Sequence, residues 1–423
     1  MMTQTSDNAI RHKLLHADAA VIGLVGFAHG TSHFFQLLMP PLFPWLMREF
    51  VLNFTEVAAL MTVIFVISGC GQALAGFPVD RFGPWRVLCC GIATLILSAL
   101  VLSVATSYAQ LMLAAVLTGL GNCVFHPADF TLLNRRVSPA RLGHAFSIHG
   151  LSGYLGWAVI PPLLVGIAGF AGWRSAALAA AGVGTLSLAL LWRHKRLLDD
   201  RTDLNHEHAA EAAAAPPSGR SFDFLRSRPV WLCFSFFVVA TMALGVLQNF
   251  APVLLREVYG LSLNISTSCL TAYLLGSAGG MASGGFLAAR GAHERIIAAA
   301  LGTAAAVALL LASGIVPWWT VPVIMAVMGF GVGLAGPSRD LLVRRAATQS
   351  IGRAAFGRVY GFVYSGMDAG FSLVPLIVGP LLDAGRYSLV FYAIALLQFL
   401  AVAVALMVGA GSRPASLNAF HQH

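Results

Sequence analysis

Residues 76–86 read GFPVDRFGPWR, a short stretch with three charged residues between two long apolar runs. The runs at 54–77 and 85–106 each exceed 20 residues, which is enough for an α-helix to cross the hydrocarbon core of a bilayer. Glycine and proline around the charges favour a tight turn. The stretch therefore predicts a polar loop that joins two membrane-spanning helices.

The composition of the whole chain agrees with this prediction. Of its 423 residues, 58% are hydrophobic and 10% charged, and the mean hydropathy is +0.78, too apolar for an ordinary soluble protein. The net charge of +9 arises from basic residues that flank apolar runs, whereas a nucleic-acid site needs them on one surface. The six cysteines show no metal or disulfide spacing. We therefore expect an integral membrane protein whose partner is the lipid bilayer, with no nucleic-acid partner.

Twelve apolar runs are long enough to span a bilayer. They cover residues 18–47, 54–77, 85–106, 109–134, 143–168, 172–193, 229–255, 264–289, 295–315, 318–338, 355–382 and 386–411. The first run is too long for the core of a signal peptide and is expected to be an uncleaved span.

One long polar stretch divides these runs into two groups of six, and its composition is typical of a linker. The predicted organisation is listed in chain order: a tail at 1–17, a first six-helix half at 18–193, a linker at 194–228, a second half at 229–411 and a tail at 412–423.

Lysine and arginine predict the orientation in the membrane, because they concentrate in cytoplasmic loops. If the N-terminus is cytoplasmic, the outward loops contain only Arg48, Arg174, Arg256 and Arg386, and the other 22 of the 26 basic residues lie inside. We therefore expect a multi-pass protein of the cell's inner (plasma) membrane with both termini in the cytoplasm.

The two halves repeat each other in sequence. PWLMRE at 44–49 matches PVLLRE at 252–257 with an offset of 208 residues, and Gly-Leu-Gly at 119–121 matches Gly-Phe-Gly at 329–331 with an offset of 210. A drift of two residues is expected of a duplicated six-helix unit. Such repeats are a known architecture of transporters, with the substrate site near the midplane where the halves meet.

The loop at 76–86 resembles the G-x-x-x-D-R-x-G-x-R signature of the major facilitator superfamily, through Gly76, Asp80, Arg81, Gly83 and Arg86. The resemblance implies an all-α integral membrane protein with 12 transmembrane helices arranged as two pseudo-symmetric six-helix halves. It also implies a monomeric transporter that works by alternating access, with the motif contributing to gating.

A narrower resemblance is carried by Phe27-Ala28-His29, by Val124-Phe125-His126-Pro127 and by Gly153 and Gly156. These residues resemble the fosmidomycin-resistance proteins, a drug-exporting branch of the superfamily. This resemblance implies proton-coupled efflux of small amphipathic or drug-like molecules, with the proton gradient as driving force and no bound cofactor.

Polar groups at membrane depth are costly and are usually functional. We expect substrate or proton contacts at His29, His33, Gln36, Asn122, His126, His149, Gln248, Asn249, Tyr364 and Asp368. Gln72, Asp129 and Gln398 are further polar residues within the predicted spans. No metal site is predicted, because the run His206-Glu207-His208 and the terminal His421 and His423 are typical of solvated segments.

Depth along the helices relates some of these residues. His29 and His33 are four residues apart and share a helix face, at roughly 16 and 22 Å from the start of their span, and Asp368 lies roughly 20 Å into span eleven. A pairing of His33 with Asp368 across the halves is therefore possible in depth. No lysine or arginine is expected at mid-depth, which disfavours a small anion as substrate.

Each candidate also has a purely structural interpretation. His29, His33 and His149 can each donate to a backbone carbonyl one turn away. His126 precedes Pro127, which lacks an amide donor, so this histidine can compensate for the missing hydrogen bond.

Two further cases concern the ends of spans. Asp129 lies just ahead of Arg135 and Arg136, and a salt bridge at the membrane boundary is the expected role. Gln248 and Asn249 are either substrate contacts or interfacial polar groups.

Two other function classes remain open beside efflux. Proton-linked uptake of a small organic metabolite uses the same scaffold. A membrane-embedded enzyme or receptor is the more distant alternative: Gly30 follows His29 where a helical metalloprotease motif has glutamate. The chain also lacks a phosphate-binding loop with its lysine, which disfavours ATP-driven pumping.

Overall fold

The computed structural model describes residues 2–138, 141–199, 223–288, 291, 293–351 and 356–411. In this part of the chain all regular secondary structure is helical. Eleven spans within it are long and apolar enough to cross a membrane by length and composition.

The first group of helices begins near the N-terminus. Its members are α1 (Met2–Gln36), η1 (Pro40–Leu42), α2 (Phe43–Phe50), α3 (Phe54–Leu74), α4 (Gly76–Phe82), α5 (Pro84–Ser103), α6 (Tyr108–Asn122), α7 (Phe125–Arg136), α8 (Leu142–Ala171), α9 (Trp173–Arg193) and α10 (Lys195–Leu198).

The second group follows residues 200–222. These residues make up most of the predicted linker and lie outside the described part of the chain. Its members are η3 (Asp223–Arg226), α12 (Arg228–Tyr259), α13 (Leu263–Ala288), α14 (His293–Ala312), η4 (Trp318–Thr320), α15 (Val321–Ile351), α16 (Phe356–Asp383) and α17 (Tyr387–Gly411).

The predicted spans and the helices differ in three places. α1 begins at Met2, so part of the predicted tail at 1–17 is helical, and α15 continues 13 residues past the predicted end at 338. α13 covers the predicted span 264–289 but does not count among the 11, because its many serine, threonine and glycine residues lower its hydropathy. The prediction of 12 spans is therefore supported for 11.

Two spans are broken rather than continuous. The first changes direction after Gln36, where Pro40 and Pro41 start η1, because proline lacks the amide that a continuing helix needs. The fourth breaks between Asn122 and Phe125, so that α6 ends and α7 begins inside one span. The break brings polar residues to the middle of the bundle.

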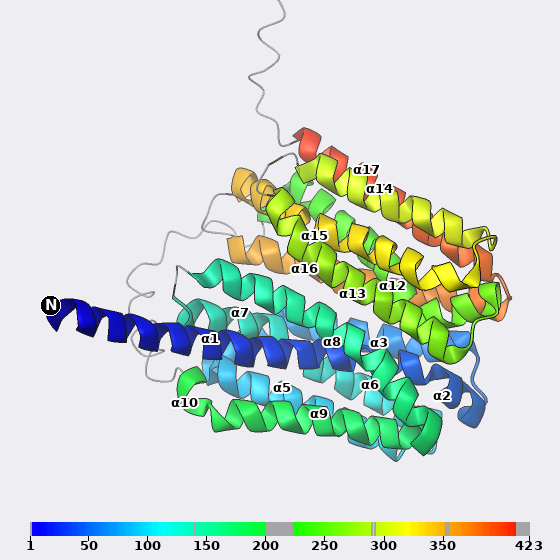
Figure 1. Ribbon diagram of the computed structural model, residues 1–423, viewed down its shortest axis with the longest axis horizontal. Helices are drawn as coiled ribbons and strands as arrows, with labels where there is room; N and C mark the ends of the chain where they lie inside the picture. Colours follow the sequence, from blue (N-terminus) through cyan, green and yellow to red (C-terminus); the bar gives the residue numbers. More distant parts are fainter. Residues whose placement is uncertain are drawn as a thin grey trace, which may run out of the picture.

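The two groups of helices lie side by side. In Figure 1 the blue-to-green helices α1 to α10 occupy one side and the green-to-red helices α12 to α17 the other, and α1 projects past its neighbours at its N-terminal end. α3 packs against α16 and α8 against α13, so these two pairs join the groups.

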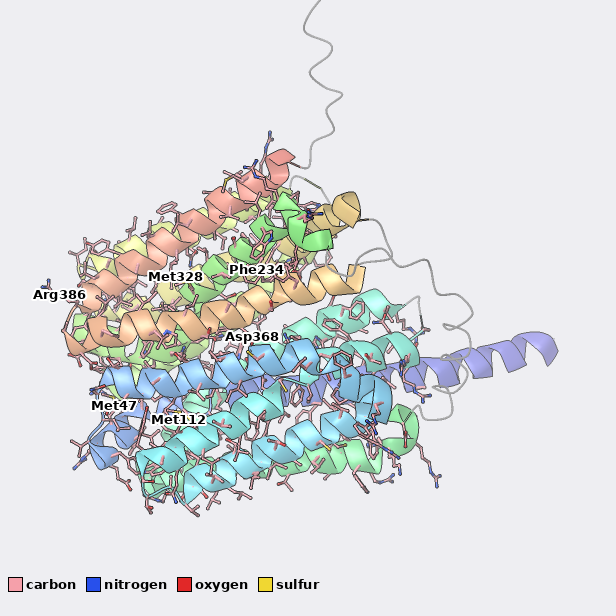
Figure 2. All side chains as sticks on the ribbon, turned by 180° about the vertical axis from the view of Figure 1, so that it is seen from behind. Met47, Met112, Phe234, Met328, Asp368 and Arg386 are labelled. Atoms are coloured by element: carbon pink, nitrogen blue, oxygen red, sulfur yellow. The ribbon has the colours of Figure 1, made fainter. Side chains whose placement is uncertain are left out.

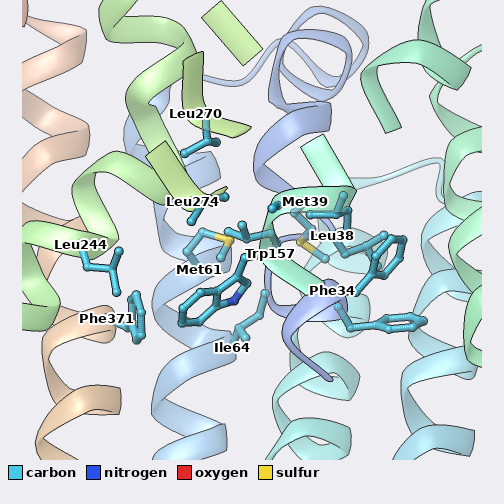
Figure 3. Packing of buried hydrophobic residues seen from close by; sticks show 14 of the residues in the cluster. Phe34, Leu38, Met39, Met61, Ile64, Trp157, Leu244, Leu270, Leu274 and Phe371 are labelled. Atoms are coloured by element: carbon cyan, nitrogen blue, oxygen red, sulfur yellow. The ribbon is translucent and has the colours of Figure 1, made fainter. Parts of the chain in front are cut away.

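The contact between α3 and α16 contains both polar and aromatic pairs. The Thr62 hydroxyl donates to the carbonyl of Ser372 at 3.0 Å, and the rings of Phe65 and Phe371 stack with centroids 4.5 Å apart. Trp157 of α8 lies 6.3 Å from Phe371 between ring centroids. Figure 3 shows this tryptophan in the apolar core between the helix groups.

Asp383, the last residue of α16, reaches the first turn of α3. Its carboxylate accepts hydrogen bonds from the backbone amides of Phe54 at 2.7 Å and of Thr55 at 3.0 Å. The next amide, that of Glu56, donates to the Asn53 side chain at 2.8 Å. Amides at a helix start have no partner within the helix, so Asp383 supplies partners for α3 from the other group.

Small residues set the distance between α1 and α8. A Cβ at Gly156 would overlap the carbonyl oxygen of Gly30, so the two backbones touch only because Gly156 has no side chain. Glycine at such crossings is typical of helices packed in a membrane.

We predict that Gly156→Ala destabilises the fold by about 1–3 kcal/mol, the usual cost of overpacking. The measurement is the thermal midpoint of unfolding in detergent micelles. Gly166→Ala on the same helix is the control, because nothing lies within 4 Å of a Cβ there. Equal midpoints for the two variants would contradict the close crossing of α1 and α8.

Candidate functional site

Histidines from two helices of the first group, α1 and α8, contact one buried carboxylate on a third helix, α7. Asp129 of α7 is fully buried, and its Oδ2 lies 3.2 Å from Nδ1 of His29 on α1 and 3.1 Å from Nε2 of His149 on α8. The rings of His29 and His149 stack with centroids 3.5 Å apart. A buried carboxylate requires such partners, because an isolated charge in an apolar medium is very costly.

Two more histidines complete this group. His33 lies one turn after His29, with ring centroids 4.4 Å apart, and packs against Trp157 at 4.2 Å. The His126 ring is 5.4 Å from that of His29. We refer to His29, His33, His126, His149 and Asp129 as the histidine cluster.

Local sequence explains how the cluster forms. His29 and His33 share a face of α1 because they are four residues apart. His126 is the second residue of α7, immediately after the break in the fourth span. Gly153 makes room on α8, because a Cβ there would lie 2.7 Å from the His33 ring.

Gln72 of α3 connects the cluster to the second group of helices. Its Oε1 lies 2.9 Å from Nδ1 of His126, and its Nε2 donates to Oδ2 of Asp368 at 3.3 Å. A Cβ at Gly69 would lie 2.8 Å from the Asp368 side chain, so α3 and α16 are in close contact there. Figure 2 shows Asp368 where α16 runs beside α3.

A second chain of hydrogen bonds links four helices next to the cluster. The Trp157 indole donates to Oε1 of Gln36 at 3.0 Å, and Gln36 Nε2 donates to Oδ1 of Asn122 at 3.1 Å. Asn122 Nδ2 then donates to the Ser68 hydroxyl at 2.8 Å. These bonds join α8, α1, α6 and α3. The polar side-chain atoms of Trp157, Gln36, Asn122 and Ser68 therefore have hydrogen-bond partners inside the bundle.

The remaining predicted residues lie in the second group. The Tyr364 hydroxyl donates to Oδ1 of Asp340 at 3.0 Å. Gln248 and Asn249 are buried in α12, and Gln248 Nε2 and both amide atoms of Asn249 make no hydrogen bond to any described residue. Unsatisfied buried amides are rare enough in folded proteins to require an explanation.

Arg339 lies inside α15, although the sequence placed it after the end of its span. Its Nε donates to Asp340 at 2.9 Å, and its guanidinium carbon is 4.8 Å from the centroid of the Phe237 ring. Arg339 thus lies near the end of the span Trp318–Leu342 and packs on an aromatic ring beside a carboxylate, and the expectation of no arginine at mid-depth stays a prediction.

The sequence motif at 76–86 has a different local structure from the predicted tight turn. Residues 76–82 form helix α4, and the chain turns at Gly83, whose φ of 86° favours glycine. Arg81 lies 5.3 Å from the ring of Phe82. The side chain of Asp80 lies outside the described residues, so the contribution of the motif to gating stays a prediction.

Two contacts differ from expectation. The predicted salt bridge of Asp129 with Arg135 or Arg136 is wrong, because the Asp129 carboxylate is buried against His29 and His149. α7 begins close to the middle of the bundle, and Asp129 is only the fifth residue of this helix.

Asp368 contacts Gln72 and Gly69 rather than His33, and Gln72 is the connection to the histidines. The sequence predicted a direct pairing of His33 with Asp368, whereas Gln72 lies between Asp368 and the histidines. The only signal for Gln72 in the sequence is an amide within an apolar run.

The geometry also allows a metal site, which the sequence did not predict. Two sets of three side chains bring their ligand atoms within 4.8 Å of one another: His29, His33 and His126, and His29, Asp129 and His149.

A sequence model described as the Major Facilitator Superfamily matches residues 23–356. The chain is similar to the fosmidomycin resistance protein of Escherichia coli (strain K12), with 30% identity over 151 residues, which are 35% of this chain and 36% of that protein. It is similar to a multidrug resistance protein B homolog of Mycobacterium tuberculosis (strain CDC 1551 / Oshkosh), with 32% identity over 150 residues, 34% of this chain and 27% of that protein.

A third relative has a different name. The probable L-galactonate transporter of Escherichia coli (strain K12) is 25% identical over 247 residues, 56% of this chain and 54% of that protein. The chain thus spans about a third of the length of the first relatives and about half of the third.

We predict that Asn122→Ala destabilises the fold by about 1–3 kcal/mol, because it leaves Gln36 and Ser68 without their buried partner. Unfolding in detergent micelles measures this change. The control is Asn134→Ala on α7, whose amide is exposed and bonds only the carbonyl of Phe130. An Asn122→Ala variant as stable as this control would contradict the hydrogen-bond chain.

Proposed function

Because the chain belongs to the Major Facilitator Superfamily and is therefore a multi-pass membrane transporter, not an enzyme, we propose that it exports small amphipathic or drug-like molecules by proton-coupled alternating access. Two of the relatives are named for resistance to fosmidomycin or to several drugs. These names support efflux as the direction of transport.

The observation that carries the coupling is the position of Asp368. This carboxylate belongs to α16 in the second group and bonds Gln72 of α3 in the first group. A protonated carboxyl group can donate a hydrogen bond and loses its charge, so binding of a proton changes the contact between the two groups. In this proposal the proton and the substrate therefore act on the same interface.

Amphipathic substrates suit the surroundings of Asp368. Trp157, Phe65 and Phe371 present aromatic surface between the two groups, and Gln36 and Asn122 lie next to it with polar amides. Binding sites for small organic molecules combine such apolar walls with a few polar groups.

Alternating access requires contacts that close one face at a time. If both termini lie in the cytoplasm, the first span ends at the outer face of the inner membrane. α3, which follows this span, then begins at the outer face. The hydrogen bonds of Asp383 to α3 then close the outer face. In this proposal, closure of the outer face by these bonds corresponds to a state that takes its substrate from the cytoplasm.

Uptake of a small organic acid is the second candidate. It is supported by the similarity to a probable L-galactonate transporter, the longest of the three alignments. Transport direction in right-side-out and inverted vesicles separates the two: efflux predicts proton-driven accumulation in inverted vesicles, and uptake predicts it in right-side-out vesicles.

Substrate identity is accessible to a growth screen. Cells that lack the protein are compared with cells that express it on a panel of drugs and organic acids, and accumulation is then measured for each hit. Protection with lower accumulation supports efflux, whereas growth on an acid as carbon source supports uptake.

We predict that Asp368→Asn abolishes proton-driven transport of such a hit but retains exchange of substrate down its own gradient. Asparagine can still bond Gln72 but cannot bind and release a proton. Transport is measured in proteoliposomes with and without an imposed pH gradient. Glu257→Gln, at the exposed end of α12, is the matched control and keeps both activities; full proton-driven transport by Asp368→Asn would refute the coupling role.

A further inference from the structure

We propose that His29, His33 and His126 form a binding site for a divalent transition-metal ion of the Zn²⁺, Ni²⁺ and Co²⁺ class. The site does not depend on the direction or coupling of transport. Neutral imidazole is the preferred nitrogen ligand of these ions in proteins.

The three rings are spaced as a shared ion requires. Their centroids are 4.4 Å apart for His29 and His33, 5.4 Å for His29 and His126, and 6.4 Å for His33 and His126. An ion about 2.0–2.1 Å from each nitrogen in tetrahedral geometry holds ring centroids roughly 5 Å apart. The observed separations bracket this value, and the ligand atoms already lie within 4.8 Å of one another.

The ring nitrogens of His33 lack well-formed hydrogen bonds. The His33 side chain is 8% exposed, and neither ring nitrogen makes a hydrogen bond of good geometry to any described residue, although the Gly153 backbone lies close to the ring. A buried polar atom without a good partner destabilises the folded protein. Coordination of an ion through one of these nitrogens would offset this destabilisation.

The other two histidines are oriented by groups behind them. Gln72 Nε2 donates to Asp368, so its Oε1 is the acceptor for an N–H at Nδ1 of His126. This tautomer leaves Nε2 of His126 without a proton. Metal-binding histidines commonly use their second nitrogen in this way.

His29 faces a carboxylate at ion-pair distance, without a hydrogen bond of good geometry. Its Nδ1 lies 3.2 Å from Oδ2 of Asp129. Its Nε2 and the Nδ1 of His33 both lie beside Gly153, at 3.2 and 2.8 Å from the position of a Cβ there. The absence of a side chain at Gly153 therefore allows two candidate ligand atoms to lie close together.

The second set of three ligands fits an ion less well. The rings of His29 and His149 are nearly parallel, with an angle of 23° and centroids 3.5 Å apart. An ion bound through ring nitrogens lies close to the plane of each ring, and one position cannot satisfy two stacked rings. Asp129 and His149 are better explained as the groups that orient His29.

Three protein ligands leave a coordination position open, as in zinc sites that bind water or substrate. His126 is the one ligand that is only partly buried. We therefore expect the ion and any additional ligand to reach the site from the side of His126, next to the contact between α3 and α16.

The test is metal binding by the full-length protein, purified without a polyhistidine tag, stripped with EDTA and dialysed against Zn²⁺ or Co²⁺. Elemental analysis gives the number of bound ions, and the visible absorption of Co²⁺ reports tetrahedral nitrogen ligands. We expect wild type to bind one ion more per chain than His33→Gln or His126→Gln. Asp129→Asn is expected to weaken this ion's binding by about 10- to 100-fold, and excess Mg²⁺ should not displace it.

The controls separate this site from other histidines. His144→Gln on the exposed face of α8 and His194→Gln after α9 should keep the extra ion. The histidines of the linker and the C-terminal tail are present in every variant, so their contribution cancels.

Folding is checked by gel filtration and the thermal midpoint, and Gly153→Ala provides a further variant that displaces His33 without removing a ligand. Equal ion counts for wild type and for folded His33→Gln and His126→Gln, or no ion bound by wild type, would overturn the proposal.

Discussion

A polar side chain inside an apolar bundle must find its partners within the protein, and Gln72 meets this constraint for two groups of helices at once. Its amide nitrogen bonds Asp368 on α16 and its amide oxygen faces His126 on α7. An amide can donate and accept at the same time, which no carboxylate or ammonium group can do. Gln72, a neutral side chain, thereby connects the carboxylate of Asp368 in one helix group with the histidines of the other group.

Backbone packing determines which polar groups meet. The crossing of Gly156 with Gly30 brings α8 against α1, and this approach places His149 on the ring of His29. The break before Phe125 ends one helix and starts another inside a single span. Small residues and a broken helix thus create the conditions for the polar contacts, and the polar contacts in turn stabilise a crossing that hydrophobicity alone would not specify.

Much of the fold was predictable because membrane spans are long, apolar and separated by charges. α13 was less clear, since its serine, threonine and glycine residues weaken that signal. In the site, the sequence identified buried polar residues but not their partners. The depth of His33 and Asp368 was a matter of counting, whereas the intervening Gln72 and the burial of Asp129 depend on helix rotation and on the break in the fourth span. Periodicity within one helix contains no information about such contacts.

The carboxylate of Asp383 lies at the positive end of the α3 dipole and accepts from two of its first amides. If the helix groups separate at this face, as the proposed alternating access requires, water must hydrate a carboxylate and two amides that now satisfy one another. The free-energy difference between the inward-facing and outward-facing states then includes the hydration of these groups, which does not depend on the substrate. Since dipole–charge attractions weaken with salt, ionic strength on that side of the membrane should bias the resting orientation.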